Sequence, residues 1–175
     1  MARGILIGAL GIIFVTIVTV SLLAMIGLLP VNADTRPGKL ETWIAKKVLH
    51  ASVKRQAQPQ SNPLSFNASN LVAGIKLYAD NCLVCHGASD GKTSNIAQGL
   101  YQKAPQLAKH GVEDDPEGRT YWVIAHGIRL TGMPAFSATL DKNQLWQLSM
   151  FLKHMHLLPP QADKVWKALA SAEVS

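Results

Sequence analysis

The chain is poor in cysteine and lacks the motifs of nucleotide-binding and hydrolytic enzymes. It has only two cysteines among 175 residues, so four thiolates cannot gather around a structural zinc ion. Glycine-rich phosphate-binding patterns are absent, and no nucleophile and base stand in a recognisable arrangement. No segment shows the alternation of a half-buried strand. These absences argue against an enzyme of the common classes and give no sign of a β-sheet.

Charge is absent from most of the N-terminal region. Ile5 to Leu29 form an uncharged run of 25 residues, which as a helix rising ~1.5 Å per residue exceeds the ~30 Å core of a bilayer. A cleaved signal peptide is the alternative, because Val31-Asn32-Ala33 offers small residues at a suitable spacing. Signal peptides have apolar regions of only ~7–15 residues, however. We therefore predict an uncleaved transmembrane anchor.

The formal net charge of +6 is unevenly distributed. Residues 61–175 carry ten basic and nine acidic side chains, which argues against a nucleic-acid-binding domain. Residues 30–60 carry only two acidic side chains and six basic ones, which are Arg36, Lys39, Lys46, Lys47, Lys54 and Arg55. Because this basic segment follows the apolar run, we expect its partner to be anionic lipid headgroups.

The same basic segment has a helical pattern of apolar residues. Leu40, Trp43, Ile44, Val48 and Ala51 recur at helical spacing. Two interpretations stay open: an amphipathic helix lying beside the membrane, and a helix that packs on the globular domain with its charges in solvent. Residues 56–66 contain two prolines and no apolar period, so they are predicted to form a linker.

The globular part is predicted to begin near Asn67. Ser69 or Asn70 can cap a helix that ends close to residue 82, and Gly74 leaves room on its apolar face for a second helix to cross closely. That second helix is expected from about Asp141, as N-cap, to Met155. Between them we expect a loop over residues 87–99 and short helical stretches around residues 105–109 and 117–126.

Both cysteines belong to one motif, Cys82-Leu83-Val84-Cys85-His86. Two thiols with two residues between them can each add to one vinyl group of a haem, and a histidine directly after the second thiol can then bind the iron. A thioredoxin-like dithiol and a structural disulfide are the alternatives, but no βαβ pattern surrounds the motif. The sequence therefore predicts one covalently bound haem c, held by Cys82 and Cys85, with His86 as an axial iron ligand.

Met133 is the best candidate for the second axial ligand. It lies between Gly132 and Pro134 in a loop rather than on an apolar stripe, and thioether sulfur is a known haem ligand that raises the reduction potential. The other methionines considered, Met150 and Met155, fit core packing or the helix end. Four histidines are rival ligands: His110, His126, His154 and His156.

The carbonyl of Pro105 is a candidate partner for His86. A backbone carbonyl that accepts a hydrogen bond from Nδ1 would fix the tautomer that leaves Nε2 for the iron. A simple turn at Pro105 is the alternative.

These features occur in an order that resembles the class I monohaem cytochromes c, in particular bacterial membrane-anchored forms. The resemblance covers about residues 67–158 and rests on the haem motif, the Ala104-Pro105-Gln106-Leu107 segment, the Gly132-Met133-Pro134 loop and a C-terminal helix bearing Trp146. It implies the all-α cytochrome c fold, with the two terminal helices of the domain crossing through Gly74, Tyr78 and Trp146. It also implies that Tyr101, Trp122 and Arg129 are candidates for haem packing or propionate contacts.

We accordingly predict four parts. They are a transmembrane anchor over residues 1–33, a basic juxtamembrane helix and linker over 34–66, a haem domain over 67–160, and a C-terminal tail over 161–175 that can be helical. The resemblance implies export, so a single-pass protein of the bacterial inner membrane with a periplasmic haem domain is expected. Its partners would be redox proteins of the membrane or periplasm and membrane lipid, with no nucleic acid and no small-molecule substrate.

The predicted function is the transport of single electrons between respiratory-type membrane complexes. With both axial positions of the iron filled, no site is left for a substrate, so the protein is not expected to be an enzyme by itself. One alternative is a fixed haem subunit of a larger dehydrogenase or oxidase complex. Another is a haem enzyme or gas sensor with a labile sixth ligand.

Overall fold

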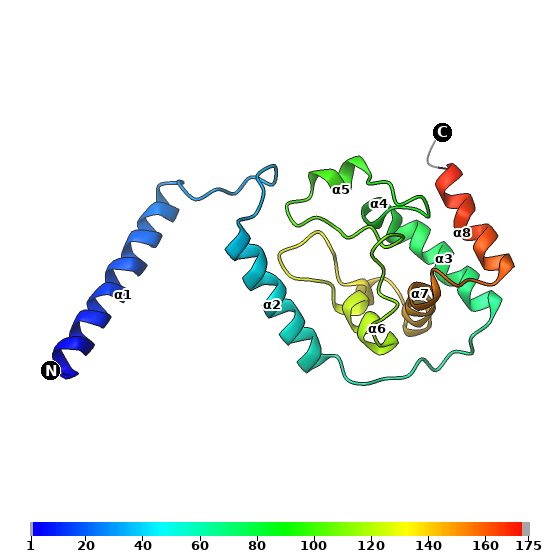
Figure 1. Ribbon diagram of the computed structural model, residues 1–175, viewed down its shortest axis with the longest axis horizontal. Coiled ribbons are helices and arrows are strands. Elements are labelled where there is room, and N and C mark those ends of the chain that lie inside the picture. The colour runs from blue at the N-terminus through cyan, green and yellow to red at the C-terminus, as the bar shows by residue number, and fades with distance from the viewer. Residues whose placement is uncertain (1, 173–175) are drawn as a thin grey trace. The chain divides into compact units, whose positions relative to one another are not determined.

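The computed structural model describes residues 2–172, and every regular element in that range is helical (Figure 1). This confirms the predicted all-α fold. The chain forms two compact units, one ending at Ala33 and the other beginning at Asp34. The finer division into four parts stays a prediction.

The first unit consists mainly of helix α1 (Ala2–Met25). None of its residues is buried in the protein, and within the described range it is the one helix long and apolar enough to cross a membrane. The side chains of α1 therefore have no protein core to join, as expected for a helix whose solvent is lipid.

The second unit is organised around the crossing of α3 (Ala68–Asn81) and α7 (Lys142–His154). Gly74 makes this crossing possible, because a Cβ atom added there would lie only 2.9 Å from the Cβ atom of Phe151. The close approach predicted at Gly74 is thus confirmed. Tyr78, one turn further along α3, is fully buried and meets the Phe151 ring edge-on at 5.5 Å between centroids.

The start of α3 differs slightly from the prediction. The N-cap is Asn67, whose side-chain oxygen accepts a hydrogen bond from the backbone N–H of Asn70 at 2.9 Å. Ser69 and Asn70 lie inside the first turn instead, because an asparagine at position 67 already satisfies a free N–H group there. The predicted N-cap of α7 is confirmed, since Asp141 forms a capping box with Gln144.

The C-terminal segment adds helix α8 (Pro160–Ala172) to the core. Trp166 is buried and contacts the rings of Tyr78 and Phe151 at centroid distances of 5.3 and 5.1 Å. Pro160 occupies the first position of this helix, where its missing N–H group costs no hydrogen bond. The segment after residue 160 is therefore part of the folded unit as far as it is described.

Helix α6 (Glu117–His126) packs on α7 from another side. Tyr121 of α6 and Trp146 of α7 stack with 4.2 Å between ring centroids. The aromatic partners of Tyr78 at the α3–α7 crossing are Phe151 and Trp166, so the aromatic contact of Trp146 is made with α6 and not with Tyr78. Met150 and Met155 are buried in the core, as predicted.

The connections between α3 and α6 contain little helix. The haem motif forms the short helix α4 (Leu83–His86), and α5 (Asn95–Gly99) adds one turn capped by Ser94 within the stretch predicted to be a loop. Residues 107–109 form a turn rather than the predicted helical stretch over 105–109, and the Pro105 carbonyl bonds to His86 and not to a following N–H group of a helix. Helix 117–126 is as predicted, and a short 3₁₀ helix, η1 (Phe136–Ala138), precedes α7.

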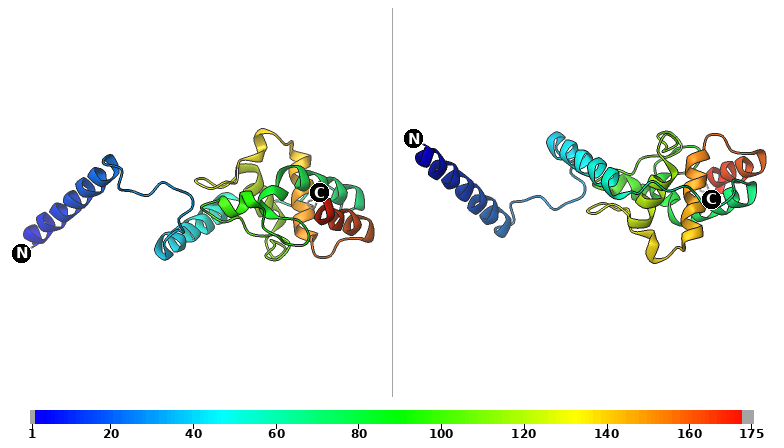
Figure 2. Two further views of the ribbon diagram at one scale, coloured as in Figure 1. Left: turned by 90° about the horizontal axis from the view of Figure 1, so that it is seen from above. Right: turned by 90° about the horizontal axis from the view of Figure 1, so that it is seen from below.

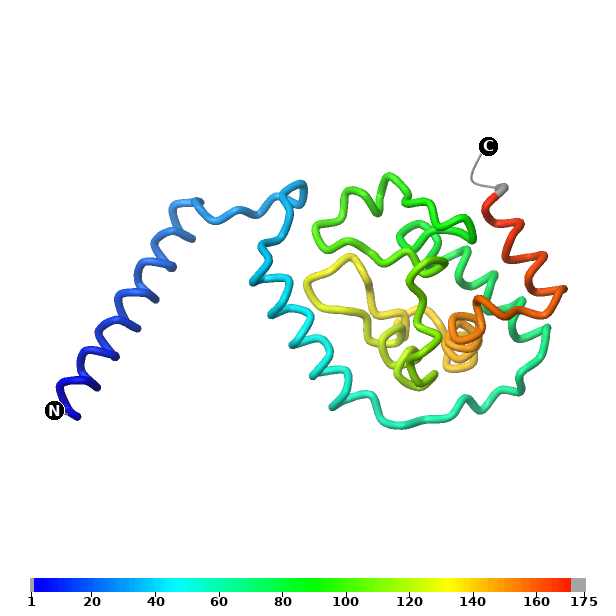
Figure 3. Tube along the Cα trace, in the orientation of Figure 1, coloured from blue at the N-terminus to red at the C-terminus, as the bar shows by residue number. Residues whose placement is uncertain are grey.

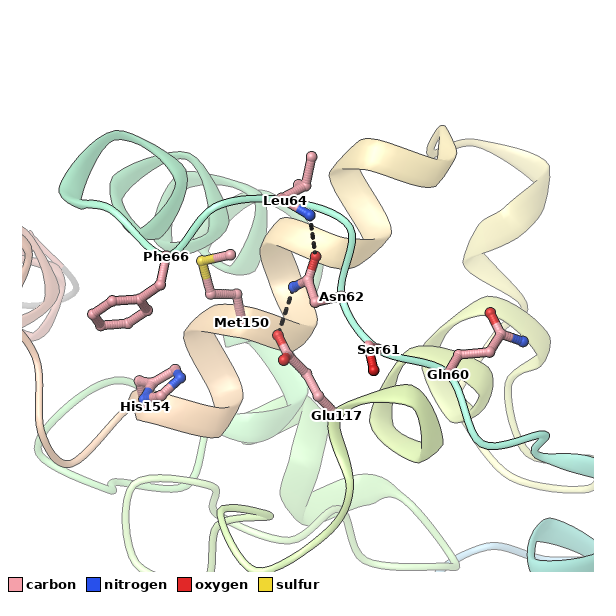
Figure 4. A pocket seen from close by; sticks show the side chains of 8 residues that line it. All are labelled: Gln60, Ser61, Asn62, Leu64, Phe66, Glu117, Met150 and His154. Atoms are coloured by element: carbon pink, nitrogen blue, oxygen red, sulfur yellow. Dashed lines mark hydrogen bonds between the residues drawn. The ribbon is translucent and has the colours of Figure 1, made fainter.

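Helix α2 (Lys39–Gln56) belongs to the second unit and lies next to α6 (Figures 1 and 2). The segment that follows it is bonded to the domain: the Asn62 amide donates to Glu117 Oε1 at 2.6 Å and to the carbonyl of Trp146 at 3.1 Å. Figure 4 shows Asn62 in this position, at the edge of an open hollow of about 410 Å³. The predicted linker is thus a strap that fastens α2 to the domain.

Candidate functional site

The haem motif forms a single helical turn directly after α3. The backbone N–H groups of Cys85 and His86 both donate to the carbonyl of Cys82, at 3.0 and 2.9 Å. Both cysteines are free thiols and partly exposed. One turn of helix therefore presents two thiols and an imidazole from a short stretch of chain.

The environment of the Cys82 thiol disfavours its charged form. Burial raises the pKa of the Cys82 thiol to about 12, and the neighbouring Cys85 adds to this effect. A thiol with such a pKa stays protonated at neutral pH, and the thiolate is the nucleophilic form.

The imidazole of His86 is held by the Pro105 carbonyl. Nδ1 lies 2.9 Å from that oxygen, and because a carbonyl can only accept, Nδ1 carries the hydrogen. Burial lowers the pKa of His86, while the bond to Pro105 acts in the opposite direction. A neutral ring with Nδ1 engaged leaves the Nε2 lone pair available for a metal.

The turn at residues 105–107 makes further bonds to the haem motif. The Gln106 side-chain amide donates to the carbonyl of Cys85 at 3.2 Å, and the Leu107 N–H donates to the carbonyl of His86 at 3.3 Å. Sequence reasoning missed Gln106, because a glutamine in a loop carries no pattern of its own. The one indication in the sequence was that Gln106 directly follows Pro105, the predicted partner of His86.

The backbone carbonyl of Gly87, the residue after His86, is also held by a hydrogen bond. Gly87 adopts a φ of +75°, and its carbonyl accepts a 2.7 Å hydrogen bond from the hydroxyl of the buried Tyr78. The α3–α7 crossing is in this way connected to the residue next to the imidazole.

Met133 lies in a loop that closes on itself after α6. The Ile128 N–H donates to the carbonyl of Met133 at 3.1 Å, and the Met133 N–H donates to Oγ1 of Thr131 at 3.2 Å. Gly127 begins the loop with a φ of +64°, and a Cβ atom there would lie 2.7 Å from the Met133 carbonyl oxygen. The loop thus gives the partly exposed Met133 side chain a defined backbone position.

The methionine loop touches the segment that holds His86. A Cβ atom added to Gly132 would lie 2.7 Å from Cδ2 of Leu100, so Leu100 packs directly on the Gly132 backbone. The chain over residues 100–105, in the green part of the trace in Figure 3, then leads to Pro105, the partner of His86. Residues 100–107 therefore contact both segments that carry the predicted axial ligands.

The residues suggested for haem packing or propionate contacts lie in different surroundings. The Tyr101 hydroxyl donates to the Glu41 carboxylate of α2 at 2.8 Å, and this hydrogen bond is the main cause of its raised pKa. The Trp122 ring lies 4.7 Å from that of His126, and Arg129 is exposed.

The rival histidines lie in ordinary surface environments. His110 and His126 are exposed, and His154 places its ring 4.5 Å from that of Phe66 at the end of α7. His156 Nε2 lies 2.7 Å from the carboxylate of Glu113.

The residues brought together fit a haem better than a bare metal ion. Among the described residues no three His, Cys, Asp or Glu side chains gather to hold an ion. A neutral imidazole, a thioether and two thiols within one helical turn are instead groups that suit a haem, the first two as iron ligands and the thiols as attachment points. The hollow in Figure 4 is lined by none of these residues.

Comparison with known proteins gives one match. Residues 69–152 match a protein-family model described as cytochrome C oxidase, cbb3-type, subunit III. Neither the curated proteins nor the solved structures include a match to the chain. The matched range begins in the first turn of α3 and ends in the last turns of α7, and it contains the haem motif, Pro105 and Met133.

Proposed function

Residues 69–152 form a domain of the cytochrome c family, and from this we propose that the protein is a membrane-anchored c-type cytochrome that carries single electrons. The observation that carries the proposal is the helical turn at residues 82–86, with two free thiols and an imidazole whose Nδ1 is bonded to Pro105. When bound, haem c supplies a one-electron Fe(III)/Fe(II) couple. The chain supplies attachment, ligands and position.

Each predicted residue has one role in this proposal. Cys82 and Cys85 would hold one haem covalently, His86 would bind its iron through Nε2, and Met133 would bind it through sulfur. Pro105 keeps Nδ1 of His86 protonated through the 2.9 Å bond. A thioether ligand stabilises the reduced state, so we expect a high reduction potential.

A carrier fits these residues better than a catalyst. His86 and Met133, from separate segments, would together bind the iron and leave it no open position for a substrate. An electron carrier needs only an accessible cofactor edge and a small, quickly released docking surface.

Helix α1 supports a location at the bacterial inner membrane. Anchoring keeps the haem domain near membrane complexes and raises its effective concentration there. Haem attachment outside the cytoplasm would place the domain on the periplasmic side. The donor could then be a quinol-oxidising complex and the acceptor a terminal oxidase.

A second candidate function is that of a fixed subunit of an oxidase complex. It is favoured by the matched family, whose description names a subunit of a cbb3-type cytochrome c oxidase. Purification from mild detergent separates the two cases, because a fixed subunit remains with other chains in constant ratio and a mobile carrier does not.

The proposal is tested by the optical spectrum of the oxidised, detergent-solubilised protein. We expect the weak far-red band of a ferric haem with methionine sulfur bound, and its loss in Met133→Ala. Met150→Leu is the matched control, because Met150 is buried in the core and this substitution conserves volume. Absence of the band from the wild type, together with carbon monoxide binding to the ferrous form, would overturn the carrier in favour of an enzyme or sensor.

A further inference from the structure

We propose that helix α2 lies on the membrane surface through the face it turns away from α6, and so fixes the orientation of the haem domain toward the bilayer. The ligand is an anionic lipid headgroup layer. The inference rests on the proposed membrane anchoring, and it adds a second contact with the membrane besides α1.

One face of α2 is already used by the protein. Val53 is buried next to α6, and with Leu49 it borders a hollow also lined by Arg119 and Val123. At the other end of α2, Glu41 accepts the hydrogen bond from Tyr101. The helix is therefore fastened to the domain near both ends.

The opposite face carries apolar side chains that the described part of the chain leaves largely exposed. Leu40, Trp43, Ile44 and Val48 are 69%, 59%, 46% and 62% exposed. At 100° per residue these four positions lie on one side of the helix, while Leu49 and Val53 lie on the other. Apolar surface left in water in this way marks an interaction site.

The charges on the exposed face identify the partner. Lys47 and Arg55 fall on the same side as the apolar stripe by helical position, and the acidic Glu41 is bonded to Tyr101 instead. A stripe with tryptophan and lysine side by side is typical of helices at the level of lipid headgroups. Each basic side chain near an anionic surface adds to the attraction.

The connection to α1 makes lipid the nearest available partner. Helix α1 ends at Met25 and α2 begins at Lys39, and the segment between them spans at most about 45 Å when fully extended. The exposed face of α2 is thereby kept within reach of the bilayer at all times. Weak intrinsic affinity is sufficient under such tethering.

The test places the full-length haem protein in nanodiscs with brominated lipids and measures tryptophan fluorescence. Trp43→Phe identifies the signal of Trp43 by difference. We expect Trp43 to be quenched in discs containing phosphatidylglycerol. Quenching should be lost in a Lys47→Glu, Arg55→Glu variant and in Ile44→Glu with Val48→Glu, and it should weaken with added salt.

Controls separate this inference from the proposed function. Lys164→Glu reverses an exposed charge on α8 and should leave quenching unchanged. The far-red band and helical circular dichroism should be retained in all variants, which shows that haem ligation and folding are intact. If brominated lipid fails to quench Trp43 in every lipid mixture, the proposal is overturned. If a co-purified membrane complex shields Trp43 from quenching, this face of α2 binds a protein instead.

Discussion

Nδ1 of His86 lies 2.9 Å from the carbonyl oxygen of Pro105, a residue 19 positions further along the chain. The same turn holds the carbonyls of Cys85 and His86 through Gln106 and Leu107. On the other side, Tyr78 holds the carbonyl of Gly87. The imidazole is thus held by Pro105, and the backbone that carries it is held by Gln106, Leu107 and Tyr78, so its orientation depends on the folded core as well as on the haem motif.

The first prediction concerns Tyr78. In Tyr78→Phe the buried carbonyl of Gly87 loses this hydrogen-bond donor, and we expect the free energy of unfolding to fall by about 1–3 kcal/mol. Urea denaturation followed by circular dichroism measures this. Tyr101→Phe, which removes a more exposed hydroxyl, is the control and should cost less. Equal losses in the two variants would contradict a special role for the Tyr78 bond.

The second prediction concerns the helix crossing. A methyl group in Gly74→Ala would lie 2.9 Å from the backbone carbonyl carbon of Gln147 and from Cβ of Phe151. The helices must move apart, and we expect a loss of about 1–3 kcal/mol in the free energy of unfolding. Gly99→Ala is the matched control, because no atom lies within 4 Å of an added Cβ there. Equal free energies of unfolding for Gly74→Ala and Gly99→Ala would contradict the close approach of the two helices.

The third prediction tests whether α8 belongs to the core. Trp166 is only 4% exposed and contacts Tyr78 and Phe151. Trp166→Ala should therefore lower the free energy of unfolding by about 3–5 kcal/mol. Trp43→Ala, at a tryptophan that is 59% exposed, should have little effect on stability in detergent. A small effect at Trp166 would mean that the C-terminal helix folds independently.

The sequence predicted the features that depend on local spacing. The haem motif, the α7 N-cap at Asp141 and the glycine at the crossing are each legible from a few neighbouring residues. Contacts between distant segments have no such pattern. The bond from Tyr101 to Glu41 joins residues 60 positions apart, and no periodicity in either segment indicates it.

The same limit applies to α2 and α8. The apolar stripe at residues 40–48 identified α2 as amphipathic, but the buried residue of α2 is Val53, from the other side of the helix. Trp166 packs on Tyr78 of α3 and Phe151 of α7 together. Only the folded unit shows that a helix can use one face for the domain and leave a second one exposed.

The fourth prediction concerns the methionine loop. Leu130 has a φ of +61° and is 92% exposed, so its side chain pays a conformational cost without a packing gain. Leu130→Gly should stabilise the protein by up to about 1 kcal/mol. Leu157→Gly is the control, since Leu157 is 85% exposed and has no positive φ, and it should be neutral or destabilising. Chemical denaturation distinguishes the two, and a loss of stability in Leu130→Gly would contradict the strain.

The fifth prediction concerns pH and the attachment of α2. The hydrogen bond to Glu41 raises the pKa of Tyr101, so the neutral phenol is favoured in the folded protein. The hydrogen bond from Tyr101 to Glu41 therefore contributes to stability at neutral pH. This contribution is lost as the pH rises through the raised pKa of Tyr101. In Glu41→Gln the acceptor is uncharged, and the pKa of Tyr101 should fall back toward its ordinary value.

Ultraviolet difference titration of the phenolate measures this pKa, with Tyr101→Phe subtracted to isolate the residue. At alkaline pH the first turn of α2 should separate from the domain while the contact of Val53 with α6 persists. Hydrogen exchange at residues 39–43 would then increase above that pH in the wild type and would already be fast at neutral pH in Tyr101→Phe. An unchanged Tyr101 titration in Glu41→Gln would show that the carboxylate does not hold the phenol in solution.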